Sequence, residues 1–347
     1  MNEYKKVRLG DVCEKGSSNI AQNEILENEG NYPIYGAAGF IKNVDFYKQE
    51  KPYIGIVKDG AGVGRVSVHP AKSSLIGTMQ YIFPKENIEI GYLAAYLKSQ
   101  NLGSLYKGAA IPHIYFKDYE NFQIPLPPIE TQKQIAVTLD KVTKIIAENK
   151  KLLEKYDLLI KSRFIEMFGD PVSNSKNLPI NLLGNLCNLK AGKSINAKEL
   201  SSVADEEHEY PCFGGNGIRG FIAKKSHHGK YVLIGRQGAL CGNVQLTDGD
   251  FYATEHAVVT NPITEQNPTW LYYCLYLLDL NRFKTGAAQP GLTVERLNKV
   301  EIIKTEIKQQ QQFAAFVHQI DKSKFVVQKS LEKAETLYKS LMQEYFG

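Results

Sequence analysis

The chain has 347 residues, of which 43% are hydrophobic and 23% are charged, and its formal net charge is +5 at pH 7. This length fits about two domains, and the small excess of positive charge permits a polyanionic partner without requiring one. The sequence shows neither a signal-peptide pattern nor a run of about 18 apolar residues, so we expect a cytoplasmic protein without a membrane segment.

Residues 1–124 combine short β-prone runs with glycine-rich turns, which favours a compact α+β domain. Tyr53–Val57 is predicted to form a strand and residues 92–97 a helix whose aromatic side chains pack in a core. Residues 125–170 follow as a separate helical segment.

The pattern of this segment predicts a long helix over residues 131–168. Pro127 and Pro128 precede it, and Gly169 and Pro171 end it. Apolar residues recur at alternating steps of four and three, as the seam of a coiled coil requires. The predicted seam residues are Ile135, Leu139, Val142, Ile146, Asn149, Leu153, Tyr156 and Ile160.

Residues 171–302 form a second region of the first kind, with a strand predicted at 231–234 and a helix at 270–275. Its stretch YPCFGGNGIRGFIAKK (210–225) contains GxGxxG and FxGxG patterns, which resemble dinucleotide-binding and S-adenosylmethionine-binding motifs. A dinucleotide site needs a helix directly after the glycines, whereas FIAKK favours a strand. A methyltransferase would also need an NPPY-like tetrapeptide, which Asn261-Pro262-Ile263 does not supply.

Residues 303–347 form a second seam-bearing helix. Its predicted seam residues are Phe313, Val317, Ile320, Lys324, Val327, Leu331, Tyr338 and Leu341. Asn149 and Lys324 are polar residues in seam positions, where they either fix the alignment of the helices or extend along the edge of a short interface.

The chain repeats itself with a shift of 178 residues. GAAIP (108–112) recurs as GAAQP (286–290), and residues 153–155 and 168–169 recur as 331–333 and 346–347. Further upstream, LGDVC (9–13) is similar to LGNLC (183–187), and YPIYG (32–36) to YPCFG (210–214). The first copy of the glycine stretch, YPIYGAAGFIKN, has neither nucleotide pattern, so we interpret the shared glycines as turn residues.

Two globular units, each followed by a long helix, with PLPPIETQKQIA at the first helix and GAAQPGLTVERL before the second, resemble the specificity subunit of type I restriction–modification enzymes. The second copy departs from the pattern at Lys304-Thr305-Glu306, where the proline-rich helix entry is missing. The resemblance covers essentially the whole chain. It implies that residues 1–124 and 171–302 are target-recognition domains and that 125–170 and 303–347 are conserved helical spacers.

The implied fold class is α+β, with two similar recognition domains separated by a long antiparallel coiled-coil helix pair in a pseudo-twofold repeat. Two different domains in such an arrangement can each read a different half-site of duplex DNA. Residues 131–168 would form a helix about 57 Å long at roughly 1.5 Å per residue, so helix length predicts the unread spacer. The implied partners are double-stranded DNA with a bipartite site, two methyltransferase (modification) subunits, and restriction or translocase subunits in the full complex.

Candidate DNA-contacting residues lie in loops that both copies share but fill with different side chains. KDGA (58–61) corresponds to RQGA (236–239), and TMQ (78–80) is matched with TEH (254–256). For each residue, base readout, phosphate contact and a surface turn remain open. The predicted residues are Lys58, Asp59, Gly60, Arg65, Thr78, Gln80, Lys107, His113, Tyr115, Arg219, Arg236, Gln237, Thr254, Glu255, His256, Lys284 and Gln289.

Two other classes of function are alternatives to DNA specificity. A coiled-coil scaffold that binds protein partners is the alternative, and steep salt dependence of binding to a bipartite duplex would separate the two. An enzyme is disfavoured because neither copy shows a catalytic constellation, so no catalytic residue and no cofactor is predicted. The five cysteines form no CxxC pair and His227-His228 is interpreted as a loop pair, so no metal site is predicted.

Overall fold

A computed structural model describes residues 4–107, 112–238, 241–285 and 291–347. The chain divides into two compact units, one made of residues 1–150 and 329–347 and the other of residues 151–328. We call them unit 1 and unit 2. Each contains one globular part and one portion of each long helix, α3 (Ile129–Phe168) and α7 (Ile307–Phe346).

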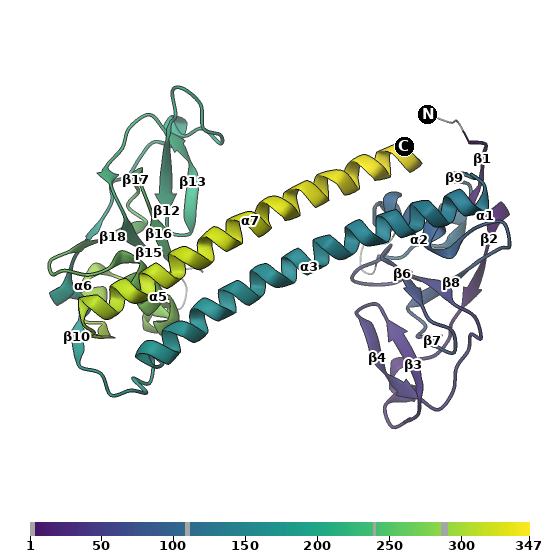
Figure 1. Ribbon diagram of the computed structural model, residues 1–347, viewed down its shortest axis with the longest axis horizontal. Coiled ribbons are helices and arrows are strands. Elements are labelled where there is room, and N and C mark those ends of the chain that lie inside the picture. The colour runs from purple at the N-terminus through teal and green to yellow at the C-terminus, as the bar shows by residue number, and fades with distance from the viewer. Residues whose placement is uncertain (1–3, 108–111, 239–240, 286–290) are drawn as a thin grey trace. The chain divides into compact units, whose positions relative to one another are not determined.

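Unit 1 is a mixed α/β unit with three small sheets (Figure 1). The strands pair in the orders β2-β8-β5-β6, β4-β3-β7 and β1-β9. Its elements besides the long helices are β1 (Lys6–Arg8), α1 (Leu9–Val12), β2 (Cys13–Ser17), η1 (Gln22–Ile25), β3 (Tyr32–Gly36), β4 (Gly39–Val44), β5 (Tyr53–Val57), β6 (Val66–His69), β7 (Ser74–Leu75), β8 (Met79–Pro84), α2 (Ile90–Ser99), η2 (Leu102–Leu105), η3 (Phe116–Asp118) and β9 (Gln123–Pro125).

Unit 2 repeats this plan with one additional short strand, β14. Its sheets have the orders β11-β18-β15-β16, β13-β12-β17-β14 and β10-β19. Its elements are β10 (Ile180–Leu182), α4 (Leu183–Leu186), β11 (Cys187–Ala191), η4 (Ala197–Glu199), β12 (Tyr210–Gly214), β13 (Gly217–Ile222), β14 (His227–His228), β15 (Tyr231–Gly235), β16 (Val244–Thr247), β17 (Asp250–Ala253), β18 (Ala257–Pro262), α5 (Pro268–Leu278), η5 (Leu280–Phe283), α6 (Val294–Asn298) and β19 (Glu301–Ile303).

The predicted elements of both regions are confirmed. Tyr53–Val57 is strand β5 and all five of its residues are buried, and its counterpart over 231–234 lies in β15. The predicted short helices lie within α2 and α5, where Tyr92, Tyr96 and Trp270 are almost fully buried and pack in cores, as the sequence predicts.

The glycine stretch of residues 210–225 forms strands β12 and β13 rather than a loop followed by a helix. The dinucleotide interpretation therefore lacks the helix that would hold the pyrophosphate.

Each hydrophobic core includes the ends of the long helices. In unit 1, Ile135 and Leu139 of α3 and Phe346 of α7 belong to the same buried cluster as Tyr92 and Tyr96 of α2. The ring of Phe346 lies 5.2 Å from that of Tyr92, centroid to centroid. Helix and globular part therefore share one core, so that neither can shift without opening it.

Unit 2 joins its helices to its globular part in the same way. Phe164 and Phe168 of α3 and Phe313 of α7 are buried with Trp270 of α5. The Phe168 ring lies 6.1 Å from the Trp270 ring and 5.8 Å from the Phe313 ring. These edge-to-face contacts are the preferred geometry for aromatic pairs.

A buried glutamine fixes the start of each long helix. In unit 1, the Gln132 amide oxygen accepts from the backbone N–H of Glu89 at 2.8 Å, and its Nε2 donates to the carbonyls of Pro127 and Asn87 at 2.9 and 3.1 Å. Glu89 is the N-cap residue of α2. One side chain thus joins the first turn of α3 to the first turn of α2.

Gln310 plays the same part in unit 2, 178 positions later. Its oxygen accepts from the N–H of Asn267, the N-cap residue of α5, at 2.9 Å, and its Nε2 donates to the Thr305 carbonyl at 3.2 Å. Helix α7 therefore begins at a fixed place although the prolines that precede α3 are missing before it.

Candidate nucleic-acid interface

The loops predicted to contact DNA are held by the same backbone hydrogen bonds in both units. In unit 1, the Lys58 N–H donates to the Thr78 carbonyl at 3.0 Å and the Lys58 carbonyl accepts from the Ile114 N–H at 2.9 Å. In unit 2, the Arg236 N–H donates to the His256 carbonyl at 3.1 Å and the Arg236 carbonyl accepts from the Leu292 N–H at 2.8 Å. We call this arrangement of three converging segments the loop frame.

A glycine two positions further on is required at the turn of each frame. Gly60 has φ +82° and Gly238 has φ +86°, a left-handed conformation that side chains with a Cβ rarely adopt. A Cβ placed on either glycine would meet no atom within 4 Å, so the dihedral angle alone requires glycine here.

The loop frame corrects one predicted alignment. Because Lys58 bonds to Thr78 and Arg236 bonds to His256, Thr78 corresponds to His256 and not to Thr254. The shift of 178 thus holds here too, and Ile76 and Gly77 are the counterparts of Thr254 and Glu255. The alignment of TMQ with TEH pairs two identical threonines, Thr78 and Thr254. These threonines are 176 positions apart and therefore two residues out of the register that strand pairing shows.

In unit 1, the predicted residues Lys58, Gln80 and Tyr115 line a cavity of about 320 Å³. Lys15 and Lys117 line it as well, which brings three lysines to one hollow. The Lys117 ammonium group lies 5.4 Å from the centroid of the Tyr115 ring. Neither Lys15 nor Lys117 was predicted. The position of Lys117 two residues after Tyr115 could have suggested it, whereas Lys15 comes from a strand far away in sequence.

Two other predicted residues of unit 1 are engaged with the protein. The Arg65 guanidinium donates to the carbonyl of Ala37 at 2.8 Å. Lys107 forms an ion pair with Asp118 at 2.7 Å, and this pair, together with the Tyr115 N–H, holds the pKa of the Asp118 carboxyl below its usual value. Lys107 and Arg65 therefore stabilise the loops that carry the other predicted residues.

The remaining predicted residues of unit 1 lie at or below the surface of the loop frame. Asp59 forms a 3.7 Å ion pair with Lys58, and His113 packs its ring edge-on against Tyr115. Thr78 is exposed. Gln80 is only 8% exposed and accepts from the Tyr119 hydroxyl at 3.0 Å, so it lies below the surface.

In unit 2, the frame presents Arg236, Gln237, Glu255 and His256 side by side. Gln237 is exposed, and the Glu255 carboxylate lies 3.2 Å from the His256 ring nitrogen. Thr254 is fully buried. Arg219 is exposed on β13 and Lys284 follows η5, whereas Gln289 lies outside the described residues.

The glycines of the nucleotide look-alike support this frame from below. A Cβ on Gly235, the residue before Arg236, would lie 2.0 Å from the carbonyl oxygen of Gly215. The two backbones therefore touch directly, and the glycine-rich stretch allows that close approach. This explains the glycines without any cofactor.

The predicted seam residues are the less exposed positions of the long helices. Ile135, Leu139, Val142 and Ile160 of α3 and Phe313, Val317 and Leu331 of α7 are buried. Those half-buried are Ile146, Asn149, Leu153, Tyr156, Ile320, Lys324, Val327, Tyr338 and Leu341.

Both polar seam residues have partners across the helix pair. In unit 1, the Asn149 amide donates to the Ser330 hydroxyl at 3.1 Å, and Lys150 forms an ion pair with Glu335 at 2.8 Å. In unit 2, Lys324 forms an ion pair with Asp157 at 2.6 Å, while Phe164 meets Phe313 further along. In unit 2 the later residue of α3, Phe164, meets the earlier residue of α7, Phe313, so the helices run antiparallel there.

Comparison with known proteins identifies the family. The model of the type I restriction modification DNA specificity domain matches residues 1–155 and again residues 181–335. The chain belongs to this family. The two matches correspond to the two copies of the internal repeat.

Sequence relatives carry the same description. The chain is 36% identical over 214 residues to the EcoprrI type I specificity subunit of Escherichia coli, covering 58% of this chain and 53% of that protein. It is 28% identical over 233 residues to the MjaVIII specificity subunit of Methanocaldococcus jannaschii, covering 62% and 54%. The chain thus spans about half the length of these curated relatives.

Solved structures confirm the fold. A type I S subunit from M. genitalium superposes with a TM-score of 0.77 at 17% identity, over 100% of this chain and 97% of that one. A chain from a structural study of a type I restriction–modification system gives 0.53 at 15% identity, over 100% and 98%.

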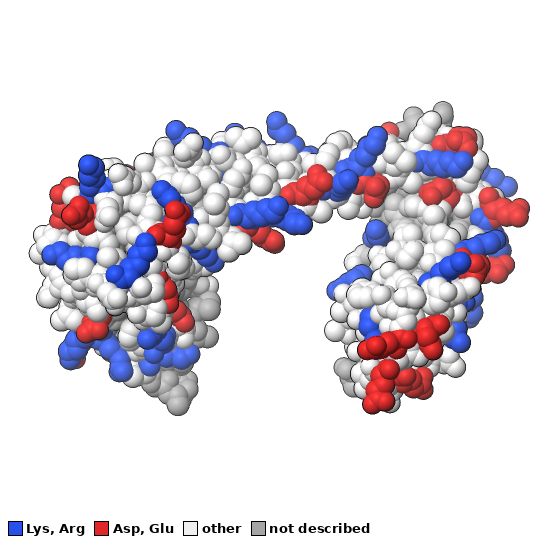
Figure 2. Space-filling model, turned by 60° about the horizontal axis from the view of Figure 1, so that its bottom comes forward, with Lys and Arg blue, Asp and Glu red and all other residues white. Residues whose placement is uncertain are grey.

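The charge of this specificity-family chain is mixed rather than concentrated. Figure 2 shows Lys and Arg interspersed with Asp and Glu, and acidic side chains gather at the end of unit 1 that lies away from the long helices. Exposed acids in the segment from η1 to β5 include Glu24, Glu27, Asp45 and Glu50. The basic hollow formed by Lys15, Lys58 and Lys117 is therefore a local feature and not part of a uniformly positive face.

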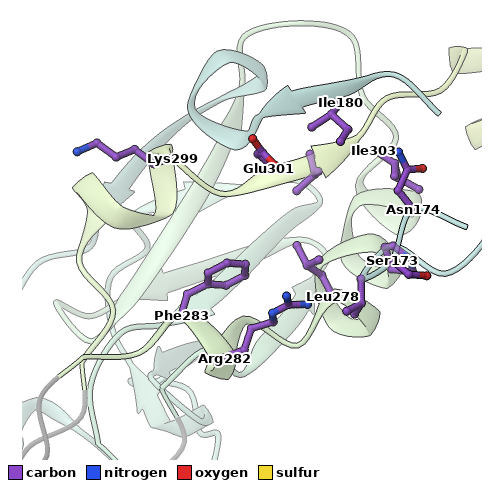
Figure 3. A pocket seen from close by; sticks show the side chains of 12 residues that line it. Ser173, Asn174, Ile180, Leu278, Arg282, Phe283, Lys299, Glu301 and Ile303 are labelled. Carbon is purple, nitrogen blue, oxygen red and sulfur yellow. The ribbon is translucent and has the colours of Figure 1, made fainter. Parts of the chain in front are cut away.

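Unit 2 of this specificity-family chain also contains a cavity of about 370 Å³ that no predicted residue lines (Figure 3). Leu278, Phe283 and Ile303 supply apolar walls, and Arg282 and Glu301 are charged residues at its border, while Lys299 points away. The residues come from the segment between α3 and β10, from α5 and η5, and from the β10–β19 pair with Lys299 before it, so no contiguous sequence signal marks the cavity.

No helix within the described ranges is both long enough and apolar enough to cross a membrane.

Proposed function

We propose that this chain is the DNA-specificity subunit of a type I restriction–modification complex, in which each unit reads one half of a bipartite duplex site. The observation that carries this proposal is the duplicated loop frame, which has the same backbone hydrogen bonds in both units and different side chains at Lys58 and Arg236. A fixed frame with exchangeable side chains is what modular readout of two different half-sites requires. Family membership supports the same conclusion.

The residues 1–124 and 171–302 are the target-recognition domains in this proposal, and 125–170 and 303–347 are the helical spacers. The chain selects the sequence, and its partner subunits carry out the chemistry on DNA in the cytoplasm. It needs no catalytic residue or cofactor of its own for that role.

The basic hollow of unit 1 is suited to the DNA backbone. Lys15, Lys58 and Lys117 can place ammonium groups around a single phosphate, and Tyr115 offers a hydroxyl donor beside them. Such contacts fix the position of the duplex and contribute to affinity without reading sequence.

The long helices offer an apolar surface for the modification subunits. On the part of α3 that belongs to unit 2, Leu152, Leu158, Leu159 and Ile165 are exposed, and 152/159 and 158/165 are each seven residues apart. Phe325 and Val326 of α7 are 59% and 66% exposed. A heptad-spaced apolar stripe outside the seam is typical of a helix that packs against further helices. We assign two modification subunits to the helices, and restriction subunits join in the full complex.

The test is the methylation pattern of cells that carry this chain and its modification subunit. Long-read sequencing should show methylated adenines in one bipartite motif, and replacing residues 1–124 with another recognition domain should change one half of that motif only. The purified chain alone should transfer no methyl group from labelled S-adenosylmethionine. Methyl transfer by the isolated chain, or loss of both half-sites on a single domain exchange, would contradict the proposal.

A further inference from the structure

The two loop frames differ in how their first side chain is held. Lys58 of unit 1 forms an ion pair with its neighbour Asp59 and lines the basic hollow. The Arg236 side chain of unit 2 forms no ion pair with any residue in the described ranges, and its one side-chain hydrogen bond there is from Nη1 to the Glu255 carbonyl at 3.4 Å. The Glu255 carboxylate faces His256 instead.

Unpartnered polar atoms gather at the frame of unit 2. Among the described residues, six buried side-chain nitrogen or oxygen atoms lack a hydrogen-bond partner, and three of them are Arg236 Nε, Thr254 Oγ1 and Glu255 Oε2. All three lie in the two adjacent turns of one frame. Buried polar groups without partners cost stability and are rare in folded proteins, so three of them in one frame are polar groups for which the chain itself supplies no partner.

Unit 1 has no such cluster at the same place. The corrected alignment puts Ile76 and Gly77 opposite Thr254 and Glu255, so an apolar residue and a glycine occupy the positions that are polar in unit 2. The cluster is therefore not a consequence of the fold, because the same backbone exists without it.

The arginine is held at one end and open at the other. Its Nε is buried, its Nη1 donates to the Glu255 carbonyl, and its Nη2 has no hydrogen bond to a residue in the described ranges. The guanidinium thus has less rotational freedom to lose on binding than a free surface arginine, and it keeps donors available.

We propose that Arg236 reads a guanine through the major groove in the half-site of unit 2, while Lys58, at the same place in unit 1, contacts a phosphate. The guanidinium is a planar fork whose two donors match the O6 and N7 acceptors that guanine presents in the major groove. Lys58 lies beside Asp59 and shares its hollow with two further lysines, so it is better suited to a phosphate than to a guanine. This inference rests on the proposed function and names the group that unit 2 recognises.

The experiment uses the complex of this chain with its modification subunits and duplexes that carry its methylation motif. Each guanine of the motif is replaced in turn by 7-deazaguanine, which lacks the N7 acceptor, or by inosine, which lacks only the minor-groove amino group. For the unaltered complex, competition binding should show one guanine in the half-site of unit 2 where 7-deazaguanine weakens binding roughly tenfold and inosine does not.

Arg236→Gln should make the complex insensitive to 7-deazaguanine at that guanine. In the other half-site, 7-deazaguanine should weaken binding as much as it does for the unaltered complex. Arg236→Lys keeps the charge but loses the bidentate fork, so it should keep only a small part of the 7-deazaguanine effect, which separates base readout from a general loss of affinity or folding. The matched variant is Lys58→Gln, which should weaken binding to all the duplexes by one common factor and lower the salt slope by about one.

Three results would overturn the inference. An unchanged guanine profile in both Arg236 variants would exclude base readout, and uniform weakening like that of Lys58→Gln would make Arg236 a phosphate contact. A half-site of unit 2 without a guanine would exclude it as well. A complex that shows no sequence preference would instead overturn the proposed function itself, so the two failures are distinguishable.

Discussion

At the scale of single residues, the two units differ at one buried position in the sheet that contains β5 in unit 1 and β15 in unit 2. His69 of β6 is 5% exposed, stacks on Tyr53 and lies 2.8 Å from the Ser67 hydroxyl. Burial lowers the pKa of His69 to about 4. The corresponding position of unit 2 is Thr247, which pairs with Tyr231 as His69 pairs with Tyr53.

We predict that unit 1 loses stability as the pH falls from about 6.5 to 4. In that window the unfolded chain binds a proton on His69 and the folded chain does not, so the free energy of unfolding falls, by roughly 3 kcal/mol in total. Hydrogen exchange of peptides from β5 at pH 7 and pH 5, corrected for intrinsic exchange rates, measures this loss of stability. His69→Thr should make the free energy of unfolding of unit 1 depend less on pH. An unaltered pH dependence would show that other groups govern the acid response.

At the scale of elements, the junction between each long helix and its globular part depends on one glutamine. Gln132→Ala leaves the Glu89 N–H and the carbonyls of Pro127 and Asn87 without their buried partner. We expect a loss of about 2 to 4 kcal/mol in the free energy of unfolding of unit 1. Denaturant unfolding followed by circular dichroism measures it.

Gln134 provides the matched control because it lies two residues further along the same helix and is exposed. Gln134→Ala should change the free energy of unfolding by less than about 0.5 kcal/mol. Equal effects of the two substitutions would mean that the Gln132 hydrogen bonds contribute nothing beyond helix propensity.

At the scale of the whole molecule, the proposed function makes the long helices a ruler for the unread spacer. We predict that one heptad inserted after Lys150 of α3 together with one after Gln328 of α7 changes the number of unread base pairs while both half-sites persist. Seven residues add about 10 Å of helix, which corresponds to roughly three base pairs of rise. The methylation motif of the variant gives the result.

Insertion of four residues in each helix is the control for this variant. It breaks the seven-residue phase and rotates the seam away from its partner, so assembly should fail. An active heptad variant with an unchanged spacer would show that flexible segments, and not helix length, set the distance.

The sequence by itself determined the organisation of this protein. The seam from Ile135 to Ile160 and the strand at Tyr53–Val57 are local patterns, because periodicity and turn residues lie in consecutive positions. The repeat with its shift of 178 residues is visible when the sequence is compared with itself. These patterns indicated two similar α+β regions separated by long helices, and the resemblance carried by PLPPIETQKQIA and GAAQPGLTVERL indicated the family. They also showed that the glycines of residues 210–225 are structural, since the first copy lacks the nucleotide patterns.

Only the tertiary structure decided which residues share a surface. Strand pairing makes Thr78 the counterpart of His256, buries Gln80 and Thr254, and brings Lys15 from β2 to the hollow of Lys58 and Tyr115. It also gives Gln132 and Gln310 their three-way contacts and leaves Arg236 without an ion-pair partner among the residues that the structure describes. The physical reason is that burial and pairing depend on distances between segments far apart in the chain, and a side chain's own neighbours in sequence do not encode those distances.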